Sequence, residues 1–395
     1  MSAAPARPAT RERWRMGVEA RALVIVSAAL LAAGLVVLYS ASALLSMREH
    51  HGSSTYYLVR QLGGVAIGVV LFAIFAKTDA ERWRGWAWPL LGASMVLLLL
   101  PVLPFMGPIA PRIHGSRRWL ELGITFQPSE LSKLAVVVWT AMLVVKKGAD
   151  MRTFTKGLLP FVVVLLVLSV LVLLEPDLSM VMTYVLLMGV ILFAGGIRLG
   201  HVLLLAALSL PLLWKMVEKV QYALLRMTSF LDPGSAPAEA NFQLKQSLIA
   251  VGSGGWFGVG FGRGHQADGF LPFPYNDFIG SNIGEEWGFA GLIVVTLLFA
   301  AYAWLGFRIA KQARTPFQSL LAMGLTVCTV STAYLHLGVV IGLLPTTGLT
   351  LPFVSYGRTN LVLTILMTGI IVNIGSTRER VALQSATDPL SPAPR

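Results

Sequence analysis

The chain has 395 residues, of which 55% are hydrophobic and 13% charged, and its formal net charge is +12. A water-soluble core cannot hold that much apolar side-chain surface, so the composition excludes a soluble globular protein and indicates an integral membrane protein. The positive charge alone would be compatible with a nucleic-acid partner. However, Lys and Arg gather in alternating loops, as the positive-inside rule predicts for a membrane protein with both termini in the cytoplasm. We therefore expect no nucleic-acid partner.

Residues 1–22 are basic and polar and form the predicted cytoplasmic N-terminus. The apolar run after them is longer than the hydrophobic region of a signal peptide, so we expect it to remain as the first spanning helix. Runs long enough to cross a hydrocarbon layer of roughly 30 Å recur about ten times, without the alternation of barrel strands. The sequence therefore predicts an all-α polytopic membrane protein with spans near residues 23–46, 60–76, 86–104, 129–145, 158–174, 178–195, 200–217, 283–306, 318–341 and 352–375.

These spans define a transmembrane domain over residues 23–375, followed by a cytoplasmic tail over 376–395 that we expect to be disordered. One extracytoplasmic loop, residues 218–282 between the seventh and eighth spans, is by far the longest. Apolar residues at helical spacing over 217–231 predict an amphipathic helix on the membrane surface at its start. The single cysteine, Cys328, excludes an internal disulfide and is expected in core packing.

The second half of this loop is rich in glycine over residues 246–264. A dinucleotide fingerprint would require a preceding strand and a βαβ unit, which the sequence lacks, so we exclude nucleotide binding. Glycines permit positive φ and close backbone approach, which suits a re-entrant turn or a ligand cradle. A flexible linker is the alternative interpretation.

Acidic residues follow the glycines. Asp277 lies between Tyr275 and Phe278, where partial desolvation would raise the pKa of its carboxyl toward that of a usable base. Glu285 and Glu286 are predicted to open a membrane-length helix, where carboxylates are favoured by the helix dipole. Capping of that helix is therefore the alternative to a role in binding.

Two further polar segments precede membrane spans. Arg117 and Arg118 approach the membrane before a helix that carries Glu130 and Lys133 at i,i+3 spacing. One interpretation is an ion pair that holds the bundle together. The other is an anion site for phosphate, because the helix N-terminus adds its partial positive charge to the three cations.

The second segment is the tight turn Glu175-Pro176-Asp177 between two spans. Its carboxylates must lie at the rim of the bundle or in a polar cavity, and turn or cap chemistry alone could account for Asp177.

Six segments together resemble the SEDS family (shape, elongation, division and sporulation), which includes FtsW and RodA. They are SRRWLELGITFQPSELSK (116–133), EPDLS (175–179), FLDP (230–233), QSLIAVGSGGWFGVGFG (246–262), NDFIGSNIGEEWGF (276–289) and LLPTTGLTLPFVSYG (343–357). The wording Gly-Leu-Thr-Leu-Pro at 348–352 is similar to the division branch, FtsW; the elongation branch, RodA, is the alternative.

This resemblance implies a peptidoglycan glycosyltransferase that polymerises lipid II, the undecaprenyl-pyrophosphate-linked disaccharide-pentapeptide, at the outer face of the cytoplasmic membrane, with the division septum as its expected location. Asp277 matches the essential aspartate of the family. The resemblance also implies a class B penicillin-binding protein, divisome regulators and membrane lipid as partners. A lipid II flippase and a scaffold that only recruits a partner are the alternatives. Gly324 and Gly338 are candidates for helix packing, with a partner or within the chain.

The resemblance gives the other polar residues roles around a pyrophosphate. Arg117, Arg118 and Lys133 match positions where cations could hold it. The carboxylates of Glu130, Glu285 and Glu286 would orient those cations or a divalent ion, Mg²⁺ or Mn²⁺, although no cofactor is required by the spacing.

The chain departs from the family at one cation. Division-branch members usually have Lys where Thr347 stands, and Arg358, just beyond that loop, is expected to supply the missing charge. The alternative is that the substitution reshapes the cavity, so that the family roles do not carry over at this position.

Overall fold

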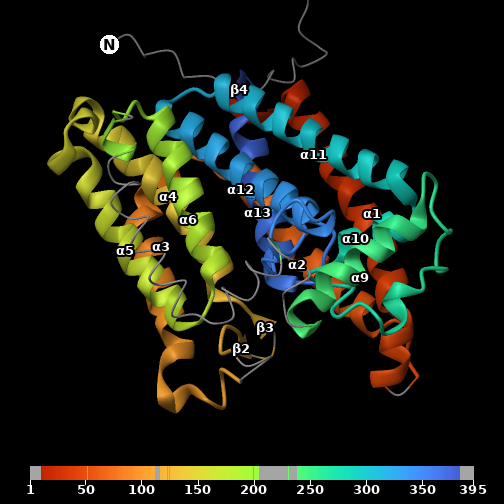
Figure 1. The fold of residues 1–395 in the computed structure, drawn as a ribbon. Coiled ribbons are helices and arrows are strands. Elements are labelled where there is room, and N and C mark those ends of the chain that lie inside the picture. The colour runs from red at the N-terminus through yellow and green to blue at the C-terminus, as the bar shows by residue number, and fades with distance from the viewer. Residues whose placement is uncertain are drawn as a thin grey trace, which may run out of the picture.

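The computed structural model describes residues 10–50, 52–111, 116–121, 123, 125–198, 200–203, 230 and 238–382. They form a bundle of long helices (Figure 1). Its elements are β1 (Thr10–Met16), α1 (Val18–Glu49), α2 (Tyr56–Lys77), α3 (Arg82–Leu99), β2 (Leu120–Glu121), β3 (Thr125–Phe126), α4 (Pro128–Lys147), α5 (Leu159–Leu174), α6 (Leu178–Ala194), α9 (Ala238–Gly254), α10 (Ile279–Glu286), α11 (Gly288–Lys311), α12 (Pro316–Val340), α13 (Arg358–Ile374) and β4 (Ser376–Ala382), with short helical turns at Leu100–Val102, Pro104–Met106, Gly148–Arg152, Phe154–Leu158 and Gln266–Asp268.

Within these residues, seven helices are long and apolar enough to cross a membrane, and α6 and α13 are shorter apolar helices. These seven and two correspond to every predicted span except the one at 200–217, confirming the predicted polytopic helical fold. Most of that remaining span lies outside the described residues, as does almost all of the predicted amphipathic helix over 217–231.

The helices differ in how far they are enclosed. In α4, 89% of the apolar segment is buried inside the bundle, and in α12 72%, whereas α2 buries only 17%. Helix α4 is therefore central although its sequence is one of the less apolar, and α2 turns most of its surface to the surrounding medium. In lipid, helices associate by close packing rather than by hydrophobic burial, so small residues lie at their contacts.

Gly324 and Gly338 illustrate this packing. A Cβ atom at Gly324 would lie 2.7 Å from Val137 of α4 and 2.8 Å from Ile191 of α6, and one at Gly338 would lie 2.8 Å from Leu344. Both glycines are therefore used for packing within the chain, the second of the two interpretations left open by the sequence.

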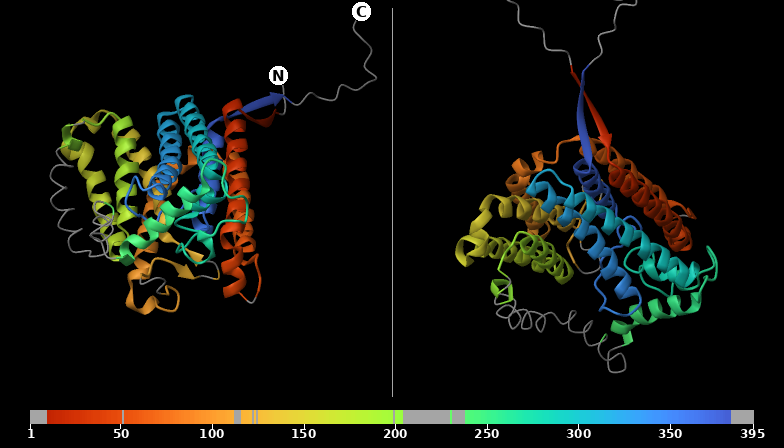
Figure 2. Two further views of the ribbon diagram at one scale, coloured as in Figure 1. Left: turned by 45° about the vertical axis from the view of Figure 1, so that its right-hand side comes forward. Right: turned by 90° about the horizontal axis from the view of Figure 1, so that it is seen from above.

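The first and last strands of the described residues pair with each other. Strand β1 pairs antiparallel with β4, with Arg15 opposite Thr377, and this terminal ribbon projects from one end of the bundle (Figure 2). The small β2–β3 hairpin lies at the other end (Figure 1), which we call the distal end. Residues 376–382, predicted as part of a disordered tail, form β4 because their backbone groups pair with β1; residues 383–395 lie outside the described residues.

Candidate active site

Asp277 lies at the distal end, in the turn that precedes α10, and its side chain is half-buried. In the loop of residues 341–357, Gly348 lies close to this carboxylate and adopts φ +70°. A Cβ atom there would lie 3.7 Å from Asp277 Oδ2. The carboxylate therefore lies directly against the backbone of this loop, at a position where the left-handed conformation favours glycine.

The 341–357 loop is fastened to the residues just before Asp277. The Tyr356 N–H donates to Tyr275 O at 2.9 Å, and Ser355 Oγ donates to Asn276 O at 2.8 Å. Gln61 of α2 donates to Ser355 O at 2.9 Å. Two segments far apart in sequence thus form one polar junction around the acid.

The Glu175-Pro176-Asp177 turn lies beside the same loop. Arg118 donates to Glu175 O at 2.9 Å, to Pro176 O at 2.6 Å and to Asp177 Oδ2 at 3.3 Å. Asp177 also accepts from Met180 N at 3.2 Å as the N-cap of α6, so the cap interpretation of Asp177 is confirmed. Arg118 therefore has partners within the chain for its guanidinium and fixes the shape of this turn.

Ser179 connects the turn to the loop against which Asp277 lies. Its hydroxyl donates to Thr347 O at 2.7 Å. Since Thr347 precedes Gly348, the EPDLS motif and Asp277 meet at adjacent residues of one loop. Three of the six motifs that carry the family resemblance therefore meet at this place, those at 175–179, 276–289 and 343–357.

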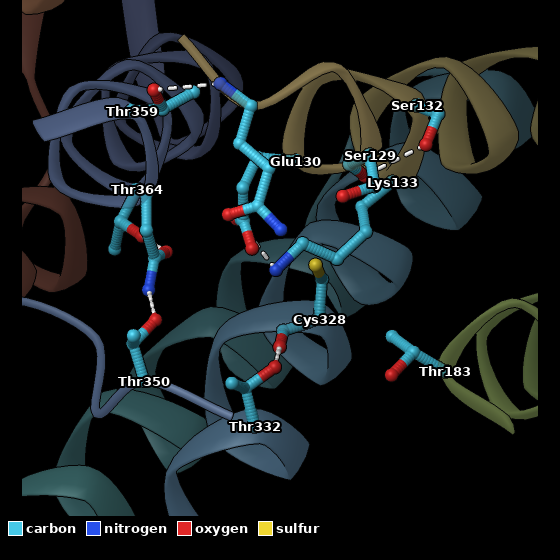
Figure 3. Close-up of polar contacts among 12 residues, drawn as sticks. Ser129, Glu130, Ser132, Lys133, Thr183, Cys328, Thr332, Thr350, Thr359 and Thr364 are labelled. Atoms are coloured by element: carbon cyan, nitrogen blue, oxygen red, sulfur yellow. Dashed lines mark hydrogen bonds and ion pairs between the residues drawn. The ribbon is translucent and has the colours of Figure 1, made fainter. Parts of the chain in front are cut away.

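Glu130 and Lys133 form an ion pair at 2.7 Å between Lys133 Nζ and Glu130 Oε2. Their residues are only 6% and 3% exposed, and they point toward one another beside Cys328 of α12 (Figure 3). The predicted pairing on α4 is confirmed. Lys133 also lies within electrostatic reach of Asp177, which connects the pair to the neighbouring turn.

The prediction for Glu285 and Glu286 was wrong in its geometry. They do not open the membrane helix but end α10, and α11 begins separately at Gly288, which adopts φ +70°. A helix cannot continue through a left-handed residue, so the dipole at this end is unfavourable rather than favourable to carboxylates.

Both carboxylates serve instead as acceptors for neighbouring segments. Glu285 accepts from His265 N at 2.7 Å and from Gln266 N at 3.2 Å, and Glu286 accepts from the hydroxyl of Ser40 on α1. Burial raises the pKa of both carboxyls above the ordinary value.

The glycine-rich segment packs on these residues. Gly260 N donates to Glu286 O at 3.1 Å and Phe289 N to Gly255 O at 2.9 Å. A Cβ atom at Gly258 would lie 2.0 Å from Glu286 O. The glycines thus permit backbone contact within the chain, so this segment is neither the flexible linker nor, in these contacts, a ligand cradle.

The remaining predicted cations lie at the distal end. Arg117 Nε is buried without a hydrogen-bond partner among the described residues. Arg358, the first residue of α13, donates to Thr125 Oγ1 of β3 at 3.1 Å, which places its charge beside the segment that leads into α4. Of the predicted cations, Arg117 therefore has the donor best suited to an anionic ligand.

The side chains that the structure describes give no positive evidence for a divalent cation. No group of three His, Cys, Asp or Glu side chains gathers among them. Glu285 and Glu286 accept from N–H and O–H donors, whereas a cation requires oxygens that face it. We therefore assign no step to a metal ion.

Sequence reasoning missed the residues that assemble the site. Gln61, Ser179, His336 and Ser355 are buried or half-buried polar side chains that bond loop backbones of the distal end. Only the presence of polar residues in or beside apolar helices could have indicated them, and that signal is as common in structural positions.

This fold and site define a polytopic helical membrane protein with an acidic residue at a junction of loops at one end of its bundle. The chain belongs to the family of cell cycle proteins that includes FtsW, RodA and SpoVE, whose family model matches residues 21–380.

Individual relatives cover most of the chain. A protein of Trichlorobacter lovleyi named probable peptidoglycan glycosyltransferase FtsW is 36% identical over 367 residues, which are 93% of this chain and 95% of that protein. Stage V sporulation protein E of Bacillus subtilis is 35% identical over 353 residues, covering 89% and 95%.

Solved structures agree with the fold. A chain from a study of the structural coordination of polymerization and crosslinking by a peptidoglycan synthase complex has a TM-score of 0.73 and 27% identity, covering 89% of this chain and 96% of that one. Rod shape determining protein RodA of Thermus thermophilus has a TM-score of 0.64 and 26% identity, covering 89% and 95%.

Proposed function

We propose that this chain is a peptidoglycan glycosyltransferase that polymerises lipid II into glycan strands at the outer face of the cytoplasmic membrane, with Asp277 as its catalytic base. The observation that carries this is the position of Asp277. It lies half-buried against Gly348, one residue from the Thr347 carbonyl that binds Ser179. Several relatives are named probable peptidoglycan glycosyltransferase FtsW, which supports the same reaction.

The chemistry requires one base. The hydroxyl oxygen of the acceptor sugar attacks the anomeric carbon of the donor, the bond from that carbon to the lipid pyrophosphate breaks, and the hydroxyl proton passes to Asp277. The pyrophosphate leaves as an anion and needs no proton, so the second carboxylic acid of a glycosidase is not required. Cations nearby stabilise the charge that develops on the leaving group.

Arg117 is the best candidate for that stabilisation, because its Nε has no partner among the described residues. Lys133 and Arg118 contribute positive charge while bonded to Glu130 and to the turn at Asp177. Glu130, Glu285 and Glu286 act as positioning residues, and Arg358 supports the start of α4 through Thr125.

The biological setting is also a proposal. The related complex couples polymerization and crosslinking, which supports a class B penicillin-binding protein as the partner here. Similarity to proteins named FtsW supports action at the division septum with divisome regulators. The gathering of Lys and Arg in alternating loops supports both termini in the cytoplasm. The elongation branch remains the alternative, since RodA shares the fold.

A reconstituted assay tests the reaction class. The purified chain, with a crosslinking-inactive partner, is given fluorescent lipid II in detergent micelles, and the products are separated on a gel. A polymerase makes a ladder of glycan strands, whereas a flippase has no second leaflet in a micelle and makes none. Absence of polymer, together with lipid II movement across liposome membranes, would contradict the proposal in favour of transport.

A scaffold makes a different prediction. If the chain only recruits a partner, cells that depend on it should divide normally when Asp277 is replaced by Ala. The polymerase predicts failed division with normal amounts of the variant in the membrane.

A further inference from the structure

His336 is a buried histidine near the C-terminal end of α12, with 1% of its surface exposed. Its Nδ1 lies 2.7 Å from Leu349 O, and Gly280 N donates to its Nε2 at 3.3 Å. A carbonyl can only accept and a backbone N–H can only donate, so the ring is neutral with its proton on Nδ1. The two ring nitrogens thus form hydrogen bonds with the backbones of two different segments.

Those two segments are the ones that place Asp277. Leu349 directly follows Gly348, against which the carboxylate lies. Gly280 lies three residues after Asp277, in the first turn of α10. A Cβ atom at Gly280 would lie 3.2 Å from His336 Nε2, so the imidazole reaches this backbone only because no side chain intervenes.

Both segments also contain strained backbone. Phe273, before Asp277, has φ +55°, and Phe353, after Leu349, has φ +65°. Non-glycine residues rarely adopt this conformation because it is strained, so the surrounding bonds must hold both residues in place. A bond from a rigid helix to each segment is a direct way of doing so.

We propose that His336 is a positioning residue that sets the Asp277 carboxylate relative to the 341–357 loop by clamping Gly280 and Leu349 from α12. The inference rests on the proposed role of Asp277 as the base. His336 itself does not touch substrate. A displacement of a catalytic group by about 1 Å can cost on the order of 100-fold in rate, so loss of the clamp should act on kcat rather than on KM.

Two substitutions separate the two bonds. In His336→Asn the amide N–H can replace Nδ1–H and keep the bond to Leu349 O, while the bond from Gly280 is lost. In His336→Gln the longer side chain can place its oxygen at Nε2 and keep the bond from Gly280 N, while the bond to Leu349 is lost. His336→Leu removes both.

Lipid II polymerisation and hydrogen exchange are then measured on the purified proteins with their partner. We expect His336→Leu to lower kcat by about 10- to 100-fold with KM changed less than about threefold, and the Asn and Gln variants to fall between it and the original. The Gly280 amide should exchange faster in the Leu and Asn variants and stay protected in the Gln variant.

Thr326→Val is the matched control. It removes a buried hydroxyl from the same helix, where Thr326 bonds only the α12 backbone at Ala322 O in the described structure. Its kcat should be unchanged.

An unchanged kcat in a folded His336→Leu protein, when Asp277→Asn is inactive, would overturn the positioning role alone. An active Asp277→Asn protein would overturn the proposed base instead, whatever His336 does. If His336→Leu does not fold, the Asn and Gln variants decide: kcat equal to the original in both overturns the clamp.

Discussion

Glu130 and Lys133 face each other at 2.7 Å in a place where neither side chain reaches the surface of the bundle. Removing one partner from a buried pair leaves an uncompensated charge and typically costs about 3–5 kcal/mol, whereas replacing both can be close to neutral. This asymmetry distinguishes a pair that only holds the bundle together from a lysine that acts on a leaving pyrophosphate.

Lys133→Met should therefore lower thermal stability strongly, by about 3–5 kcal/mol, and the double variant Glu130→Gln with Lys133→Met should recover most of it. Stability is measured by thermal unfolding in detergent and activity by lipid II polymerisation. If Lys133 stabilises the leaving group, the double variant stays inactive although it is folded. Recovery of activity together with stability would assign the pair to structure alone.

Glu175 is the other buried acid at this end of the molecule. It is 1% exposed, and neither carboxyl oxygen has a hydrogen-bond partner among the described residues. Burial, together with the nearby Asp177 carboxylate, raises the pKa of Glu175 to about 9, although the Arg118 guanidinium opposes this. The group is therefore protonated in the folded protein at neutral pH.

This gives stability a pH dependence with a definite sign. Between the ordinary pKa of 4.5 and the folded value of about 9, the folded state holds a proton that the unfolded state has lost. Stability contributed by this group therefore decreases as pH rises through that window. Glu175→Gln removes the dependence, so its Tm relative to the original protein should increase from pH 5 to pH 9.

Glu121→Gln, which removes an exposed carboxyl of β2, controls for the loss of one titratable group. A Tm difference for Glu175→Gln that stays constant over this pH range would contradict the raised pKa.

Among the elements, the break between α10 and α11 has the clearest physical cause. Gly288 adopts φ +70°, and a Cβ atom there would lie 2.3 Å from Gly258 N. The left-handed residue both ends α10 and lets the glycine-rich segment dock on the start of α11. Glu285 and Glu286, the last two residues of α10, accept hydrogen bonds from Gln266 N and Ser40 Oγ.

Gly288→Ala should consequently destabilise the protein by more than the roughly 1–2 kcal/mol of an unfavourable left-handed conformation, since the backbone contact is also lost. The Tm in detergent should fall clearly. Gly92→Ala is the control, because Gly92 lies on an exposed face of α3 with no atom near its Cβ position. Equal effects of the two substitutions would mean that the close approach at Gly288 is unimportant.

The break between α10 and α11 also shows which features of the fold could be predicted from the sequence. Hydropathy located the spans because partition into lipid depends on composition over about twenty residues. Hydropathy predicted residues 283–306 as one helix because it depends only on neighbouring residues. The break at Gly288 depends on contact with Gly258, about thirty residues earlier in the sequence.

The site was also predicted only in part: contacts within one helix were predicted, and contacts between distant segments were not. The Glu130–Lys133 ion pair was predicted correctly, because pairing at i,i+3 is a local property of a helix. The use of Arg118 to hold the turn at Glu175, and of His336 to hold two loops, depends on tertiary contacts between distant segments. Sequence spacing could not supply these contacts.

At the scale of the whole molecule, the terminal ribbon of β1 and β4 lies at one end of the bundle and the β2–β3 hairpin at the other (Figures 1 and 2). Helix α13 crosses directly between them, from Arg358 at the junction to Ile374 beside β4. The terminal ribbon and the polar junction at Asp277 therefore lie toward opposite ends of α13.

A cysteine pair tests this arrangement, because Cys328 is buried and is the only native cysteine. Arg15→Cys with Thr377→Cys should form a disulfide in oxidised membranes, since these residues are Cα partners in the ribbon. Arg15→Cys with Val381→Cys, a mismatched register, should not.

The single Arg15→Cys protein should react with a membrane-impermeant thiol reagent only when the cytoplasmic side is accessible. Labelling from outside intact cells would contradict the proposed orientation.

The most direct measurement compares the chain with Asp277→Asn, which keeps the size of the side chain and removes the base. Both proteins, with their partner, are assayed for lipid II binding and for glycan polymerisation under the same conditions. The account predicts unchanged binding and a rate lower by about 100- to 10,000-fold. A rate within threefold of the original, in a protein that binds lipid II normally, would show that another group takes the proton.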